Sequence, residues 1–134
     1  MSPLLQSSRI RQRIAQLVQQ REMAERVILG RQDLLRGTVT EVQRMCGKPG
    51  CKCTKGEKHV CYQLSASIKG RTHTQNVPRK QLETVQCLTD DYRCFRQARA
   101  AWVQLNAQII EFINQLERVR TIKSIPDEHR RKKS

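Results

Sequence analysis

The sequence contains few aromatic residues, few acidic residues and no long apolar run. Five aromatic side chains in 134 residues leave little surface on which unpaired bases could stack, which disfavours a single-stranded RNA-binding protein. No run of 18 apolar residues occurs, and Arg9, Arg11 and Arg13 interrupt the first twenty residues. A membrane span needs a run of about that length, and an export signal needs a shorter apolar stretch near the N-terminus, so we expect a cytoplasmic protein with no membrane partner.

Sequence motifs of common catalytic sites are also absent. The chain has no phosphate-cradling Gly-x-x-x-x-Gly-Lys-Ser/Thr loop, no serine elbow and no cluster of paired carboxylates. Between residues 37 and 80 the carboxylates are Glu41 and Glu57 alone, which is a poor supply of general bases for a catalytic metal. The sequence therefore predicts a protein that is not an enzyme and has no small-molecule substrate.

The scarcity of acidic residues leaves a large positive charge. Twenty-six Lys and Arg stand against twelve Asp and Glu, which gives a net charge of +14 and an isoelectric point near 10.2. Residues 37–80 hold nine of the basic residues and two of the acidic ones. Such a field attracts phosphate polyanions or an acidic protein, and we expect the contact to lie in this middle segment.

Apolar residues recur at helical spacing over 8–36, which predicts a long first helix. Ser7 or Ser8 would cap its start, and Gly37 would terminate it. Gly30 lies inside this run and costs about 1 kcal/mol relative to alanine, so the helix could break there.

The next segment, 37–77, carries strand signals. Residues 38–42 are rich in β-branched side chains, and apolar and polar residues alternate after Tyr62. Lys69 and Gly70 supply a tight turn, so 62–77 is predicted to form a β-hairpin.

Helical patterns return after the hairpin, with a short helix predicted over 78–88 and a long one over 90–123. Thr89 would cap the long helix, and 126–134 is expected to be a disordered basic tail. The long helix carries an uninterrupted heptad seam: Phe95, Ala98, Trp102, Leu105, Ile109, Phe112, Leu116 and Val119.

These elements predict an α+β fold in a single domain over residues 1–125. The two long helices would form an antiparallel, coiled-coil-like pair, and a small zinc-stabilised β-hairpin or three-strand insertion would lie at its tip. The heptad seam would pack on the first helix of the same chain. A homodimer formed through residues 95–119 is the alternative.

Four soft metal ligands lie within sixteen residues, in a loop that is rich in glycine. They are Cys46, Cys51, Cys53 and either His59 or Cys61. Zinc prefers four tetrahedral nitrogen and sulfur ligands, and thiols stay reduced in the cytoplasm. We therefore expect a structural zinc ion rather than free thiols or an iron–sulfur cluster.

The same segment resembles the signature of a small prokaryotic domain family of unknown function. From Arg44 to Cys53 it reads Arg-Met-Cys-Gly-Lys-Pro-Gly-Cys-Lys-Cys, and a Gly-x-x-His ending at His59 and a tyrosine-bearing strand follow. The resemblance covers roughly residues 36–120. It implies His59 as the fourth ligand, because the position of Cys61 is usually not cysteine in similar sequences. It implies no activity.

A loop fixed by zinc would lose little conformational entropy when its basic side chains bind a ligand, which suits contacts with the phosphates of nucleic acid. The sequence thus predicts a small basic accessory protein that contacts duplex DNA through residues 44–80. A non-enzymatic adaptor, which binds partners through the heptad helix and the basic tip, is the alternative. The candidate DNA contacts are Arg44, Lys48, Lys52, Lys55, Lys58, Lys69, Arg71, Arg79 and Lys80.

Overall fold

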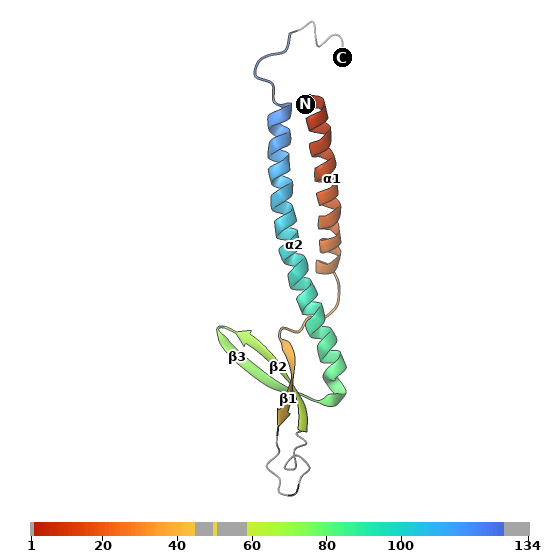
Figure 1. Cartoon of the computed structure of the whole chain (residues 1–134), viewed down its shortest axis with the longest axis vertical. Coiled ribbons are helices and arrows are strands. Elements are labelled where there is room, and N and C mark those ends of the chain that lie inside the picture. Colours follow the sequence, from red (N-terminus) through yellow and green to blue (C-terminus); the bar gives the residue numbers. More distant parts are fainter. Residues whose placement is uncertain (1, 45–49, 51–58, 128–134) are drawn as a thin grey trace. The chain divides into compact units, whose positions relative to one another are not determined.

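The computed structural model describes residues 2–44, 50 and 59–127, which form two α-helices, a 3-10 turn and a three-stranded antiparallel sheet (Figure 1). The predicted α+β class is confirmed. The residues fall into two compact units, one of residues 1–26 and 98–134 and the other of residues 27–97, and each is described by itself. The single domain over 1–125 stays a prediction. In the described part of the chain, neither helix combines the length and apolar character that crossing a bilayer requires.

Helix α1 spans Pro3–Ile28, so the predicted range 8–36 is wrong at both ends. The helix begins earlier because Ser2 caps it. The Leu5 backbone N–H donates to Ser2 Oγ at 3.3 Å, and the proline that follows Ser2 suits a first helical position. Ser7, which was expected to cap the helix, is instead buried within it.

The helix ends two residues before Gly30, where the sequence allowed a break. The Gly30 N–H donates to the Val27 carbonyl at 3.2 Å in a closing turn, and residues 30–36 then continue without regular structure. Glycine loses more conformational freedom in a helix than other residues, which favours termination here.

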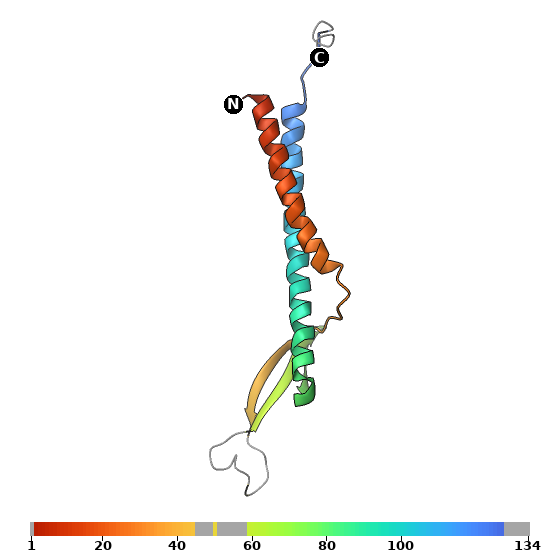
Figure 2. The same ribbon diagram turned by 90° about the vertical axis from the view of Figure 1, so that its right-hand side faces the viewer.

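In the first unit, α1 lies beside the second half of α2 (Leu82–Arg120) and runs in the opposite direction (Figure 1, Figure 2). Leu17 and Ile109 are the most deeply buried apolar side chains of this pair, with 1% and 4% exposed. Seven of the eight residues of the predicted heptad seam belong to this unit, from Ala98 to Val119, and all seven are buried or half-buried. Packing of the two helices within one chain is therefore confirmed.

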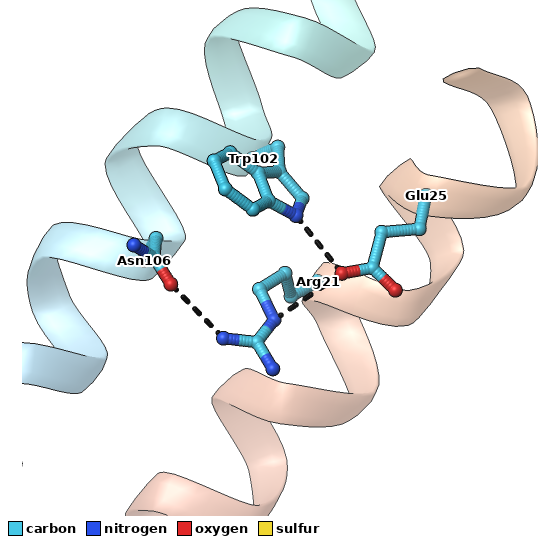
Figure 3. A network of polar contacts seen from close by, with 4 residues as sticks. All are labelled: Arg21, Glu25, Trp102 and Asn106. Carbon is cyan, nitrogen blue, oxygen red and sulfur yellow. Dashed lines mark hydrogen bonds and ion pairs between the residues drawn. The ribbon is translucent and has the colours of Figure 1, made fainter. Parts of the chain in front are cut away.

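A small polar network crosses the interface between these helices (Figure 3). Trp102 Nε1 donates to Glu25 Oε1 at 2.9 Å, and Arg21 Nη1 donates to Asn106 Oδ1 at 3.0 Å. Arg21 Nε lies 3.5 Å from the same Glu25 oxygen in an ion pair. Because polar groups in an interface cost free energy when they lose their partners, this network favours one register of the two helices.

Helix α2 is continuous, whereas the sequence predicted two helices over 78–88 and 90–123. It follows a single 3-10 turn, Arg79–Gln81, and its last helical residue is Arg120. Thr89 caps nothing: it is 3% exposed, and its hydroxyl donates to the Gln86 carbonyl at 3.0 Å. The helix continues through this point because no glycine or proline interrupts the sequence between Pro78 and Pro126.

In the second unit, strands β1 (Thr38–Arg44), β2 (His59–Ile68) and β3 (Arg71–Val77) form the sheet in that order. The predicted first strand and hairpin are confirmed, and β1 and β2 are longer than expected. The turn between β2 and β3 is Lys69–Gly70, and both residues have positive φ, 52° and 78°. That pair of angles is typical of the tight turns that match the twist of a two-stranded ribbon.

Gly37 brings the start of β1 against β2, which differs from its predicted role as a helix terminator. Its φ is +142°, and a Cβ atom there would lie 2.6 Å from Leu64 Cδ1 and 2.9 Å from the Ser65 carbonyl oxygen. Just before it, the Leu35 N–H donates to the Leu88 carbonyl of α2 at 3.2 Å. Together these contacts place the start of the sheet beside the first part of α2.

Replacing Gly37 should therefore destabilise the protein more than replacing a turn glycine. We expect Gly37→Ala to lower the free energy of unfolding by about 2–5 kcal/mol, through backbone strain and overpacking. The matched control is Gly70→Ala, where φ is also positive but the new Cβ would meet nothing within 4 Å, and the cost should be about 1 kcal/mol. Urea unfolding measures both, and equal costs would contradict the close approach at Gly37.

Candidate nucleic-acid interface

Strand β2 separates the predicted basic residues into two groups, because it runs the whole length of the sheet. Arg44 is the cross-strand partner of His59 at one end of the strand, and Arg71 is the partner of Ile68 at the other. Ten strand residues span about 30 Å at roughly 3.3 Å each. The described basic residues of the predicted interface over 44–80 therefore fall into two separate positive regions rather than one. We call them the loop end and the turn end.

The loop end comprises Arg44 at the end of β1 and Arg79 and Lys80 just after β3. All three residues are exposed. Val77, the last residue of β3, pairs with Tyr62, three residues from His59, so Arg79 and Lys80 follow β3 at this same end of the sheet. The four lysines predicted to contact DNA between β1 and β2, namely Lys48, Lys52, Lys55 and Lys58, lie outside the described residues.

The predicted metal ligands fall mostly in the same undescribed segment, since Cys46, Cys51 and Cys53 lie outside the described residues. His59 and Cys61 are described, and both lie on β2. They are two residues apart and therefore share one face of the strand. His59 is the exposed first residue of β2, whereas Cys61 is half-buried and pairs with Val42.

No group of three or more metal-ligating side chains gathers among residues 2–44, 50 and 59–127. The ladder nevertheless closes the segment between β1 and β2 at its base, because Arg44 and His59 are directly paired. This pairing holds the two chain ends of the cysteine-rich segment on neighbouring strands.

The turn end contains the predicted Lys69 and Arg71, both exposed beside the tight turn. It also contains three arginines that sequence reasoning missed: Arg36, Arg93 and Arg96 line a hollow together with the start of β1 and the end of β2. The spacing of Arg93 and Arg96 places them on one helical face, a signal that the sequence carried. Nothing in the sequence indicated that Arg36 would lie beside that face.

The predicted basic residues lack acidic partners in the described ranges. The ion pairs found there are Arg21 with Glu25 and Arg93 with Asp90. Arg44, Lys69, Arg71, Arg79 and Lys80 therefore form no ion pair with a described carboxylate. Positive charges without an ion-pair partner among the described residues, at both ends of one sheet, favour an extended polyanion over a small anionic ligand.

Strand β3 adds a polar ribbon between the two ends. Residues 71–76 are exposed without interruption, and their side chains are basic, hydroxyl, imidazole or amide groups. Gln63 Nε2 donates to Asn76 Oδ1 at 3.5 Å across the sheet. Such side chains donate hydrogen bonds readily, which suits contact with phosphate and sugar oxygens.

These observations define an α+β protein with a helical pair and a basic three-stranded sheet. The chain belongs to the family of a domain of unknown function, DUF6788, whose family model matches residues 7–86. This match reaches further towards the N-terminus than the resemblance over 36–120, and it ends near the start of α2. No curated protein matches the chain. No solved structure matches it either.

Proposed function

We propose that this protein is a small, non-enzymatic accessory protein that binds duplex DNA through the phosphate backbone. The observation that carries the proposal is the set of exposed basic side chains, without acidic partners in the described residues, at both ends of the sheet. The unit of residues 27–97 contains thirteen Lys and Arg and six Asp and Glu, a net charge of +7. Lys and Arg bind nucleic acid by displacing the counterions condensed on phosphates, so this excess supplies affinity directly.

A duplex suits the sheet better than a single strand. Among the strand residues Tyr62 is the one aromatic side chain, and it is half-buried, so no row of aromatic platforms is available for unpaired bases. The two ends of β2 are about 30 Å apart, which corresponds to about nine base-pair steps along the axis of a duplex at roughly 3.4 Å each. A rigid double helix presents phosphates at fixed positions over that distance.

A structural zinc ion forms the second part of the proposal. Cys46, Cys51 and Cys53 would supply three thiolates, and His59 or Cys61 would complete the tetrahedron. The Arg44–His59 pairing supports this assignment, because it closes the cysteine-bearing segment at its base and leaves His59 exposed at the boundary. Cys61 lies further inside the ladder, so we favour His59. The bound ion would contribute charge neutralisation and loop order, and no chemistry on a substrate.

DNA affinity should fall steeply with salt, with a log–log slope near −0.9 for each phosphate contacted. Neutralising the turn end with Lys69→Gln and Arg71→Gln should reduce the magnitude of the slope by about 1.8 if both residues contact phosphate. A loop-end variant with Arg44→Gln, Arg79→Gln and Lys80→Gln should also flatten it, because these three exposed charges lie at the other end of the sheet.

The control for this titration is Arg11→Gln with Arg99→Gln, which removes two exposed charges from the helical unit and should leave the slope unchanged. Fluorescence anisotropy with a short duplex measures all four proteins. The proposal fails if the turn-end and loop-end variants bind as tightly as the parent at every salt concentration.

Metal analysis of the purified protein should find about one zinc ion per chain. Cys51→Ser should abolish zinc binding and destabilise the sheet, because metal affinity is coupled to folding. His59→Ala and Cys61→Ala, made separately, identify the fourth ligand: one should lose the metal and the other should keep it. A metal-free parent protein, purified without chelators, would refute the zinc assignment.

The second candidate is a protein-interaction role in which this chain pairs with a second copy. The heptad seam is already used within the chain, but Val103, Ile110 and Ile113 form another stripe on α2 at spacings of 7 and 3. Their side chains are 53%, 51% and 47% exposed. Burying this stripe against its own copy would create a four-helix arrangement within the predicted range 95–119.

Light scattering should then report a dimer for the parent chain. Ile110→Glu with Ile113→Glu should produce a monomer of unchanged helicity, because both positions are exposed in the monomer. Gln104→Glu, at another exposed position of the helix, is the control and should remain dimeric. A monomeric parent at high concentration would exclude this arrangement.

A further inference from the structure

A hollow of about 310 Å³ lies at the turn end of the sheet, within the unit of residues 27–97. It is bounded by the residues around the start of β1, by the end of β2 and by one face of α2. Three arginines line it, Arg36, Arg93 and Arg96, and the hydroxyl-bearing residues Thr38, Ser65 and Ser67 line it as well. None of these six residues belongs to the contacts predicted from sequence.

The fold brings these residues together from three separate segments. Thr38 and Ser65 are directly paired across β1 and β2, and Ser67 lies two residues further along the same face of β2. Arg93 and Arg96 are three residues apart and therefore share one side of α2. The hydrogen bond from the Leu35 N–H to the helix carbonyl at position 88 holds the chain next to α2 just before Arg36.

The hollow carries more positive than negative charge. Arg93 Nη1 lies 3.2 Å from Asp90 Oδ1, but both side chains are about 60% exposed, so water screens this pair. Arg36 and Arg96 have no ion pair or hydrogen bond from their side chains within the described ranges. Three guanidinium groups lining one hollow repel each other, and a bound anion would relieve that repulsion.

Phosphate is the anion that this lining suits best. Guanidinium groups present paired N–H donors that match two phosphate oxygens, and the hydroxyls add further donors. The volume equals that of about ten water molecules at roughly 30 Å³ each, which accommodates a phosphate group and its hydration. Tyr92 is the one aromatic residue in the lining, so a nucleobase would find a single ring on which to stack.

We propose that the hollow formed by Arg36, Arg93 and Arg96 binds one phosphate group of the nucleic-acid backbone. This inference rests on the proposed DNA-binding function and assigns it a specific anchoring point. The cross-strand pairing of Ser67 with Thr72 and of Ile68 with Arg71 places the hollow next to the exposed cations of the turn. The hollow would therefore extend the turn-end contact by one phosphate.

The test combines two measurements on the full-length chain and its variants. Titration with inorganic phosphate, followed by amide NMR shifts, reports on the hollow without any DNA. The salt dependence of duplex binding reports whether a backbone phosphate occupies it. The variant is Arg36→Gln with Arg96→Gln, and the matched control is Arg31→Gln with Arg99→Gln, which removes one loop and one helix arginine, both exposed and neither lining the hollow.

We expect phosphate to shift the amides of residues 36–38 and 65–67 in the parent and in the control, but not in the variant. The variant should also lose about 0.9 from the magnitude of the salt slope, equivalent to one phosphate, while the control keeps the parent slope. Circular dichroism should show equal helicity in all three proteins. Arg36→Lys with Arg96→Lys keeps the charge but loses the paired donors, and it should weaken phosphate binding by several-fold.

Three results would overturn the inference. If phosphate shifts these amides but the variant keeps the parent slope, the hollow binds a free phosphate and not the backbone. If the control loses as much slope as the variant, net charge alone accounts for the effect. If phosphate shifts no amide and the variant and the parent have equal salt slopes, the hollow binds no phosphate. A steep salt dependence of duplex binding by the parent would in that case still support the proposed DNA binding. A parent that binds no duplex refutes the proposed function separately.

Discussion

The arrangement of the basic sheet depends on the close approach of the chain at Gly37 to β2 and on the hydrogen bond that precedes it. A side chain at Gly37 would overlap Leu64 and the Ser65 carbonyl, so β1 can begin at this point only because the Cβ atom is absent. The Leu35 N–H bonded to the Leu88 carbonyl holds the same segment against α2. These two contacts set the start of β1, and with it the register that pairs Arg44 with His59 at the far end.

The sheet then determines how the positive charges are distributed in space. The basic residues of 44–80 are close in sequence and would belong to one patch in a flexible chain. The ten-residue strand β2 instead separates the loop end from the turn end by about 30 Å, which is more than three Debye lengths at physiological salt. The charges of the two regions are therefore screened from each other by salt. Such an arrangement suits an extended polyanion, whose charge repeats along its length.

The helical unit uses its polar groups differently. Apolar seam residues alone would tolerate sliding of α1 along α2, because one heptad step replaces Ile109 by another apolar residue. The bonds from Trp102 to Glu25 and from Arg21 to Asn106 remove that freedom (Figure 3). A slip would leave an indole N–H and a carboxylate without partners. The network therefore supplies specificity of register, and Leu17 and Ile109 supply the apolar burial.

The sequence by itself determined the elements whose signals are local. Alternating residues and the Lys69–Gly70 turn predicted the hairpin, since a tight turn needs only its own two residues. The heptad spacing predicted which side of α2 is buried, since it follows from helical geometry alone. The helix boundaries were less predictable: Ser2 instead of Ser7 starts α1, and Thr89 lies within one continuous helix because nothing nearby interrupts it.

Tertiary structure decided which distant residues meet. The sequence offered nine candidate DNA contacts as one group, and the sheet register divided the described members between two ends. It also brought Arg36 beside Arg93 and Arg96, a juxtaposition that depends on an interaction between residues 35 and 88. Local propensity carries no information on contacts between segments more than fifty residues apart, because those contacts arise only when the sheet packs on α2.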